Sequence, residues 1–543
     1  MGRCFGGRPR RWSARETRAV RPLTAVVRLL KVLTLIQPVV LMRWRCSAAG
    51  PASARRRRCG GSHSGRGPVL SGPSPSPLGV RSPLVSEVRM PVVVKWRYAL
   101  VMTSALALAV SGCSSGSSDS SSAGGRKNLQ FWFWGAPPAH QAAMKKILVN
   151  GFNASQSKYR LSVTFNNNVD QNVQVALTAN RGPDIVYGSG PAFAAAYVGK
   201  GKLANMDPYA KKYGWKSRLL GPMYESGTVG GKLYSLPNSL NTLGIFYNKK
   251  VLAKLKEPVP KTFAQLTSVM DKAKAAGLYA SVTGNKGWKP VNENYSSIFL
   301  THDAGPSVIQ RALTGKIPWT SPQIVKAVQD SADFYKKGYL AGKDYNNLNF
   351  TDSMQLLKDE KSPFFIGPSL AFQFATDYFN DANGNVDDLG FTSFPNVNKS
   401  LASPLYTLGT TASLSINAHS PNKDGAAEVI NYMLSPSYAK QMTKVWPGYW
   451  GVPLKKFDAD PGDFSGLSKQ YVTAIQNMIN TVNQGNFGYF TATFFPPATE
   501  QALVNIDSVW LGKTSARTFL DGVESTFKTE LDKKLVPPIP QQK

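Results

Sequence analysis

The chain from residue 128 onward predicts an α/β fold in which each domain holds a mostly parallel sheet flanked by helices. Short apolar runs of strand length alternate with segments of helical periodicity, an alternation typical of units that build parallel sheets. Pro and Gly residues stand where such helices would begin and end. About 415 residues follow this point, which indicates two domains rather than one.

Six segments have the composition of strands. Residues 129–134 form a continuous apolar run closed by Gly135, as expected for a buried strand of a parallel sheet. Apolar and polar side chains alternate over residues 161–165, which predicts a strand with one buried face. The other predicted strands cover residues 185–187, 243–248, 364–366 and 414–416.

Helices are predicted between these strands from their start and stop signals. Thr262 and Gln265 have the spacing of a capping box, and Gly277 is expected to end that helix. A proline at the first helical position predicts helix starts after three serines. These serines are Ser321, Ser420 and Ser435, and Gly338 is expected to end the first of the three helices. Further helices are predicted over residues 144–152 and 173–179 and before Gly512.

An apolar segment toward the end of the first quarter of the chain predicts export. Residues 99–112 follow Lys95 and Arg97 and lead into Val-Ser-Gly-Cys113, which resembles the lipobox of bacterial lipoproteins. The alternative is a membrane anchor, but 14 residues are too few to span about 30 Å of hydrocarbon. We therefore expect a lipoprotein signal peptide over 90–112, lipidation of Cys113, and a Ser/Gly-rich linker over 113–127.

Residues 1–89 have the composition of a disordered basic leader. They carry 18 Lys and Arg residues against Glu16 and Glu87, with a Gly/Pro/Ser-rich stretch from residue 60 to 83. One interpretation is a basic arm that binds nucleic acid. The interpretation that we favour is a mis-assigned start, with translation beginning at Met90, because an export signal behind 89 residues would not function.

Charge, cysteine and histidine usage restrict the function classes. Of the net charge of +32, residues 1–89 carry +16, and the basic residues after position 127 are dispersed, so no nucleic-acid partner is expected. No cysteine follows Cys113, which excludes a disulfide, a thiolate nucleophile or a Cys-type zinc site there. His140, His302 and His419 lack ligand spacing, and we expect surface or loop residues rather than metal ligands.

Eight motifs in the same part of the chain resemble, in order, those of the extracellular solute-binding proteins of family 1, the sugar-binding lipoprotein components of bacterial ABC importers. They are RGPDIV (181–186), GKGKL with DPY (199–209), GGKLYSLP (230–237), FYNK (246–249), PKTFAQL (260–266), residues 417–431, GVP (451–453) and LGKTS (511–515). Gly230 departs from the family pattern, in which an acidic residue is common.

The resemblance implies a two-lobe, periplasmic-binding-protein-like fold of type II, with solute bound between the lobes and hinge strands connecting them. The chain is then expected to cross between lobes near residues 240–242, near 406–411, and just after 455–456. Lobe 1 would comprise 128–240 plus 412–457, and lobe 2 would comprise 241–411 plus 458–543.

A sugar ligand requires flat aromatic faces for its C–H groups and polar groups for its hydroxyls. Positions at expected strand ends, crossings and loops supply both kinds, although each aromatic residue could equally belong to the core. The candidate ligand-binding residues are Trp134, Gly135, Tyr187, Ser189, Asn238, Asn241, Trp288, Asn294, Tyr295, Ser369, Tyr406, Gly409, Thr410, Tyr449 and Trp450. Ser369 stands where many family members carry an aromatic residue, so Phe372 or Phe374 is the alternative stacking platform.

The expected function is capture of a mono- or oligosaccharide and its delivery to the permease of an ABC transporter. We expect a monomer without cofactor or metal, tethered to the extracellular face of the membrane of a Gram-positive, high-GC bacterium. Residues 381–387 have calcium-loop spacing but lack Gly and Glu at the required positions, so a surface turn is expected. The alternatives are a non-sugar solute, a sugar sensor, or a secreted carbohydrate-active enzyme, for which no acid/base pair is marked.

Overall fold

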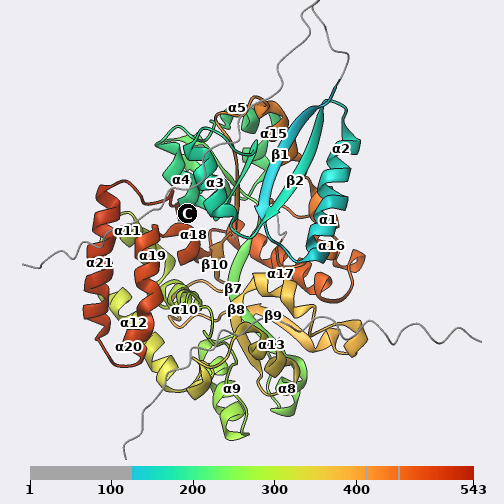
Figure 1. The fold of residues 1–543 in the computed structure, drawn as a ribbon. Helices are drawn as coiled ribbons and strands as arrows, with labels where there is room; N and C mark the ends of the chain where they lie inside the picture. The colour runs from blue at the N-terminus through green and yellow to red at the C-terminus, as the bar shows by residue number, and fades with distance from the viewer. Residues whose placement is uncertain (1–124, 411, 450–452, 543) are drawn as a thin grey trace, which may run out of the picture. The chain divides into compact units, whose positions relative to one another are not determined.

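The computed structural model describes residues 125–410, 412–449 and 453–542. The predicted leader, signal peptide and lipidation site at Cys113 lie outside the described residues, as does Trp450. Residues Ser114–Lys543 belong to one compact unit. Its described part is built on two main sheets, each with helices packed against it, so the predicted two-lobe α/β fold is confirmed (Figure 1).

The first sheet has the strand order β2–β1–β3–β11–β6. Its strands are β1 (Lys127–Trp134), β2 (Tyr159–Asn166), β3 (Ile185–Gly188), β6 (Leu236–Pro237) and β11 (Ser413–Ile416). β1 runs parallel to β2 and β3, whereas β11 runs antiparallel to β3 and β6. The continuous apolar run is indeed β1, and Phe131 and Phe133 are fully buried in it.

The second sheet has the order β12–β10–β7–β8, with β9 also paired to β7. Its strands are β7 (Asn241–Asn248), β8 (Phe364–Pro368), β9 (Leu389–Ser393), β10 (Tyr406–Gly409) and β12 (Phe487–Tyr489). Among the described strands of this second sheet only β10 and β12 pair in parallel, so the expectation of a mostly parallel sheet is wrong for this lobe. The chain reaches β7 from the first lobe and returns toward that lobe after β10. β7 therefore starts, and β10 ends, at the same side of the second sheet, so these two neighbouring strands run antiparallel.

Among the described strands the chain changes sheet three times, and the first two crossings lie close together. The third crossing lies between β11 and β12. β6 is followed by β7 after residues 238–240, and β10 is followed by β11 after residues 410–412. A hydrogen bond of 3.2 Å between Ser239 Oγ and Thr410 Oγ1 joins the two crossing segments. The limits of the lobes given above stay predictions.

A small hairpin stands just before the first crossing. β4 (Thr228–Val229) pairs antiparallel with β5 (Lys232–Leu233) through Gly230 and Gly231, whose φ angles are +57° and +76°. A two-residue turn with both φ angles positive accepts Gly-Gly as well as Asp-Gly, so Gly230 fits the position where the family pattern often has an acidic residue.

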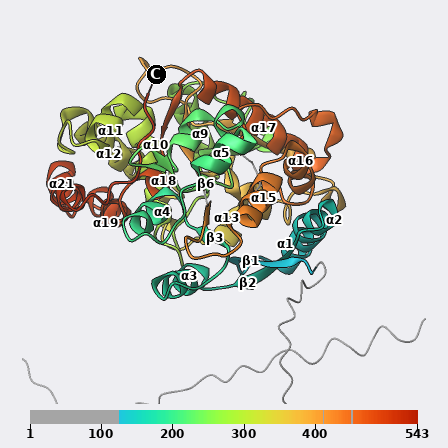
Figure 2. The ribbon, with the colours of Figure 1, turned by 90° about the horizontal axis from the view of Figure 1, so that it is seen from above.

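Helices that precede β7, together with the first two helices after β11, belong to the first sheet and its surroundings. They are α1 (Pro138–Met144), α2 (Gly151–Ser155), α3 (Val169–Thr178), α4 (Pro191–Val198), α5 (Asp207–Tyr213), α6 (Trp215–Arg218), α7 (Gly221–Glu225), α15 (Lys423–Met433) and α16 (Pro436–Val445). A π-helical stretch, Lys145–Asn150, joins α1 to α2. α2 packs on β2, α3 on β1 and β3, and α15 on β11, and Figure 2 shows α1 and α2 beside β1 and β2.

The remaining helices lie in the second lobe. They are α8 (Lys249–Lys254), α9 (Phe263–Ala275), α10 (Val291–Phe299), α11 (Pro306–Leu313), α12 (Pro322–Lys336), α13 (Phe350–Lys358), α14 (Phe372–Ala375), α17 (Gly466–Asn483), α18 (Thr491–Phe494), α19 (Pro497–Leu503), α20 (Asp507–Trp510) and α21 (Ala516–Asp532). A second π-helical stretch, Leu300–Ala304, continues α10. Trp510 anchors this lobe, because its buried ring stacks on Tyr335 and its Nε1 donates to Ser331 Oγ at 2.9 Å.

Two sequence expectations need correction. The helix predicted to start after Ser420 begins at Lys423 with Asn422 before it, and the Ser420 hydroxyl instead donates to Asp184 Oδ1 at 2.5 Å. His302 is not a surface or loop residue: it is 0% exposed in the second π-helical stretch, with Nδ1 2.9 Å from Asn396 Oδ1. Burial lowers the pKa of His302 to about 4, so the ring is neutral near pH 7.

The capping box of α9 is confirmed. Thr262 Oγ1 accepts from Gln265 N at 3.2 Å, and Gln265 Oε1 accepts from Thr262 N at 3.1 Å. Thr262→Ala should lower the free energy of unfolding by about 1 kcal/mol, because the backbone amide of Gln265 in the first turn of α9 loses its acceptor. Urea denaturation measures this loss, and Thr267→Ala inside the same helix is the control. Equal effects of the two substitutions would contradict a specific cap.

Candidate ligand-binding cleft

Four aromatic side chains, which we call the aromatic cluster, gather at the ends of β1 and β3. They are Trp134, Tyr187, Trp446 and Tyr449, from three separate segments of the chain. The ring of Tyr449 stacks on Trp446 with centroids 4.9 Å apart and lies 6.0 Å from the ring of Trp134. The hydroxyls of Tyr187 and Tyr449 are 3.4 Å apart. Three of these four residues are sequence-predicted site residues, and the structure brings them together.

The two tyrosine hydroxyls of the aromatic cluster stay neutral. Burial raises the pKa of Tyr187 to about 12, and burial raises the pKa of Tyr449 well above its usual range. The side chains of Trp134 and Asn238 both interact with the Tyr449 hydroxyl. Asn238, another predicted site residue, is buried at the first crossing, so the aromatic cluster extends to the hinge.

The segment that carries Trp446 and Tyr449 contacts both lobes. Trp446 Nε1 donates to Oε1 of Gln373, in α14 of the second lobe, at 2.7 Å. Gly448 has a φ of +95°, and a Cβ there would lie 2.8 Å from the backbone nitrogen of Gln373. Glycine is therefore required by both the conformation and the close approach of the second lobe.

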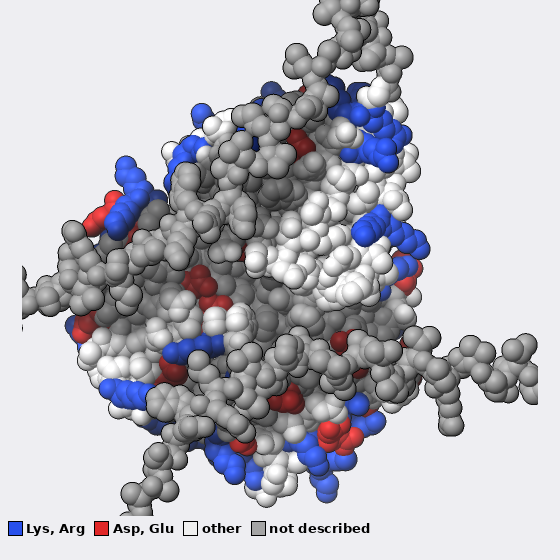
Figure 3. All heavy atoms as spheres, viewed as in Figure 1, with Lys and Arg blue, Asp and Glu red and all other residues white. Residues whose placement is uncertain are grey.

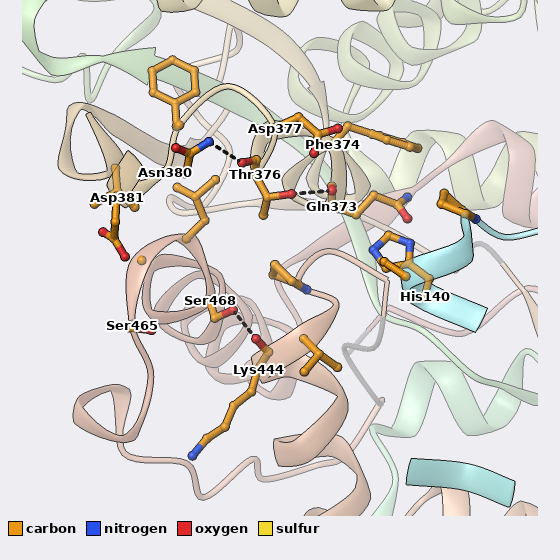
Figure 4. A pocket seen from close by; sticks show the side chains of 18 residues that line it. His140, Gln373, Phe374, Thr376, Asp377, Asn380, Asp381, Lys444, Ser465 and Ser468 are labelled. Carbon is orange, nitrogen blue, oxygen red and sulfur yellow. Dashed lines mark hydrogen bonds between the residues drawn. The ribbon is translucent and has the colours of Figure 1, made fainter. Parts of the chain in front are cut away.

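A cavity of about 410 Å³ lies between the lobes beside this contact. His140 from α1 lies next to Gln373 of the second lobe, whereas the Lys444 side chain from α16 points away from Gln373 and Asp377 (Figure 4). Phe374 and Asp377 also line the cavity. The His140 ring stacks on Trp446 with centroids 4.0 Å apart, and burial lowers its pKa although Asp377 opposes the shift. Of these residues, sequence reasoning selected only Phe374, as an alternative stacking platform, because no local pattern joins segments so far apart.

A second cavity, of about 320 Å³, lies at the strand ends of the first lobe. Trp134 and Tyr187 line it together with Asn167, Asn168 and Asp170, which follow β2. Gly135 approaches this loop so closely that a Cβ would lie 1.8 Å from Asn167 Oδ1. The predicted residue Ser189 is exposed just after β3. The cavity thus combines an aromatic wall with the amides of Asn167 and Asn168, which no sequence pattern indicated.

A third cavity, of about 360 Å³, lies in the second lobe and is mostly apolar. Its walls include Trp288 and Asn294, both predicted, together with Phe350, Phe365 and Phe374. The Trp288 ring is 56% exposed, which is unusual for so large an apolar side chain. Phe374 lines this cavity and the interlobe cavity, so it can take the place of the aromatic residue missing at Ser369.

The prediction that Phe372 could stack on a sugar is wrong. Its side chain is fully buried and packs against Phe246, Phe391 and Tyr471 in the core of the second lobe. Tyr295 likewise lies in the core, where its ring contacts Tyr345 and Trp510. Helical and loop aromatics are most often core residues, and the sequence alone could not separate these two from Trp288.

The remaining predicted residues lie at or beside the two crossing segments, residues 238–240 and 410–412, and form contacts there. Asn241 Oδ1 accepts from Ser369 Oγ at 2.7 Å and from Leu370 N at 3.1 Å, which binds the loop after β8 to the start of β7. Thr410 Oγ1 donates to the Ala412 carbonyl at 2.7 Å. Tyr406 and Gly409 are buried in β10, and burial raises the pKa of Tyr406 to about 12. These five residues contact other parts of the chain, and none of them lines one of the three cavities.

Residues 135–440 match the family described as bacterial extracellular solute-binding protein, which is more than half of the chain. The chain belongs to this family. A probable sugar-binding periplasmic protein of Mesorhizobium japonicum is 27% identical over 117 residues, and this match spans 21% of the present chain and 28% of that relative.

Two solved structures share the fold of this solute-binding protein. One comes from a study of xylan utilization by Caldanaerobius polysaccharolyticus: it is 19% identical, covers 73% of this chain and 99% of its own, and has a TM-score of 0.62. The other is a chitin oligosaccharide binding protein that is 18% identical, covers 74% and 98% of the two chains, and has a TM-score of 0.61.

The described residues contain neither a candidate metal-binding cluster nor a candidate membrane-spanning helix. No group of three or more His, Cys, Asp or Glu side chains among them could hold a metal ion. No helix in the same part of the chain is long and apolar enough to cross a membrane.

On the face drawn in Figure 3, the Lys and Arg side chains that are not covered are scattered rather than gathered into one patch.

Proposed function

We propose that this protein captures a carbohydrate between its two lobes and delivers it to the permease of an ABC transporter. The observation that carries the proposal is the arrangement of aromatic faces beside amides in the cavities of both lobes. Trp134 lies beside Asn167 in the first lobe, and Trp288 lies beside Asn294 in the second. Sugar rings present C–H faces that stack on aromatic rings and hydroxyls that bond to neutral amides.

The same lining disfavours an amino acid as the solute. A zwitterion requires a cation for its carboxylate, most often the forked guanidinium of arginine, and an acid for its ammonium group. Among the described residues that line the three cavities none is an arginine, and the two lysines, Lys286 and Lys444, lack the forked guanidinium. The names of the sugar-binding relative and of the chitin oligosaccharide binding protein support a carbohydrate as well.

We propose that the protein acts by binding alone, without catalysis, and works as a monomer. Closure of two lobes around a solute is a common response of such folds, and the permease would recognise the closed form. A lipid on Cys113 would hold the protein at the extracellular face of the membrane and raise its effective concentration near the permease. A separate ATPase would supply the energy of transport.

Thermal unfolding of the full-length protein against mono- and oligosaccharides, with amino acids and polyamines as controls, tests the proposal. A ligand at 100 times its dissociation constant should raise the free energy of unfolding by about 2.7 kcal/mol. We expect a shift of the melting temperature with one class of sugar and no product formed from it. A shift with an amino acid or polyamine and with no sugar would contradict the carbohydrate assignment.

A further inference from the structure

The cavity of the second lobe has a wall of mainly apolar and aromatic side chains, and several of these are partly exposed to solvent. Its volume is about 360 Å³. Phe350 and Phe374 in its wall are half-buried, and Trp288 is 56% exposed. Apolar side chains that gather without being covered often mark a binding site, because removing them from water is favourable. The cavity therefore points to an apolar group of a ligand.

Three phenylalanine rings of this wall meet edge to face. The Phe350 ring centroid lies 5.5 Å from that of Phe365, with 86° between the ring planes, and 5.3 Å from that of Phe374, with 67° between the planes. Aromatic rings prefer this geometry because the ring edge is positive and the face is negative. A further aromatic ring gains from such contacts as well as from burial, whereas an alkyl chain gains from burial alone. The wall therefore favours an aromatic group.

The cavity offers few polar partners to a ligand. The Thr283 hydroxyl is already used, because it donates to the Ile366 carbonyl at 2.7 Å and accepts from Ile366 N at 2.9 Å. The amide atoms of Asn294 have almost no accessible surface, so they would bond a ligand only after neighbouring atoms shift. Lys286 is exposed. A sugar ring inside the cavity would leave most of its hydroxyls unpaired, which is costly, so the sugar itself is expected outside it.

The cavity lies beside the place where the chain first crosses between the lobes. Leu370 in its wall donates its backbone N–H to Asn241 Oδ1, at the start of β7, at 3.1 Å. Phe374 lines both this cavity and the cavity between the lobes. A group attached to a sugar between the lobes is therefore within reach of the cavity. An apolar cavity of about 150 Å³ already holds benzene, so the volume suffices for an aryl group.

We propose that the ligand is an aryl glycoside, whose aromatic aglycone occupies the cavity of the second lobe among Phe350, Phe365 and Phe374. Its sugar would lie between the lobes and stack on the exposed ring of Trp288. The proposal rests on the carbohydrate function proposed above and narrows it to one class of substrate.

Calorimetric titration of the full-length protein with matched glycosides tests the proposal. The probes are the methyl and phenyl β-glycosides of glucose, galactose and xylose, with phenol as the aromatic group without a sugar. We expect the phenyl glycoside of at least one sugar to bind at least about 10-fold more tightly than the methyl glycoside of the same sugar.

The contrary outcomes separate this proposal from the carbohydrate function. Equal or tighter binding of the methyl glycosides overturns the aryl proposal and leaves the carbohydrate function standing. Binding of phenol alone, or of neither member of any pair, also overturns the aryl proposal. The thermal unfolding panel described above then decides the carbohydrate function separately.

Two alanine substitutions of half-buried phenylalanines distinguish the cavity from the rest of the lobe. Phe350→Ala removes one ring of the wall and should reduce the preference for the phenyl glycoside to within about 3-fold. Phe391→Ala is the matched control, because Phe391 packs against Phe246 and Phe372 in the same lobe and does not line the cavity. We expect the control to keep the preference. Retention of the preference in Phe350→Ala, or an equal loss in both variants, would overturn the proposal.

Discussion

Replacing Glu293 by glutamine should raise the free energy of unfolding at pH 7 by about 1–3 kcal/mol. Glu293 lies in α10, its side chain is 3% exposed, and Oε2 has no partner among the described residues. Burial, together with the facing carboxyl of Glu500, raises the pKa of Glu293 well above its usual range. The folded protein must therefore hold a proton that the unfolded chain releases, and glutamine removes this requirement.

The same substitution should flatten the dependence of stability on pH. Above the ordinary pKa of a glutamate, about 4.3, the folded state binds one proton more than the unfolded state, so stability falls as pH rises by up to about 1.4 kcal/mol per pH unit. Urea denaturation between pH 6.5 and 8.5 measures the slope. His302 contributes below that window. Because its pKa is about 4 in the folded protein and 6.5 in the unfolded chain, the unfolded chain binds more protons between these values, and stability falls as pH falls.

Glu530 provides the matched control for Glu293. It is also buried, but its carboxylate accepts from Ala498 N, Thr499 N and Thr499 Oγ1, each at 2.8 Å. Glu530→Gln should lower stability at pH 7, because a charged cap on the start of α19 is lost. Destabilisation by Glu293→Gln, or an unchanged pH slope, would contradict the protonated state of Glu293.

Replacing Trp134 by alanine should weaken sugar binding by about 30-fold or more, as for other central aromatic contacts. Trp134 ends β1, lines the cavity of the first lobe, and is only partly buried, so a face remains for a ligand. Calorimetric titration with the sugar identified by thermal unfolding measures the loss.

Trp132→Ala is the control for Trp134. Trp132 lies on the same face of β1, two residues before the strand end, and it does not line that cavity. We expect Trp132→Ala to lower stability while the dissociation constant stays within about 3-fold. Equal weakening by both substitutions would indicate a general loss of structure and would contradict a specific role of Trp134.

Local patterns in the sequence predicted much of the fold. The apolar run of β1, the capping box at Thr262 and the start of α16 at Ser435 depend on neighbours in sequence, and each is confirmed. The direction of strands in the second sheet was wrong, because periodicity reports which face is buried and not which way the strand runs. The start of α15 was misplaced, because the Ser420 hydroxyl is bonded to the distant Asp184.

The candidate site could be predicted only in part. Trp134, Tyr187 and Tyr449 stand at strand ends or in an aromatic-rich segment, and the structure brings them together. His140 and Gln373 meet through Trp446 across more than 200 residues, so no spacing rule could select them. Tyr295 and Trp288 have similar sequence surroundings, and only packing distinguishes the core residue from the exposed one.

Calorimetric titration of the wild-type protein and of the Trp134→Ala and Trp288→Ala variants with one sugar tests most directly whether the ligand lies between the lobes. Trp288 is largely exposed, so its removal should leave stability nearly unchanged. Because one tryptophan belongs to each lobe, we predict that either substitution alone weakens binding by at least about 10-fold. Full affinity in both variants would contradict a carbohydrate held between the two aromatic faces.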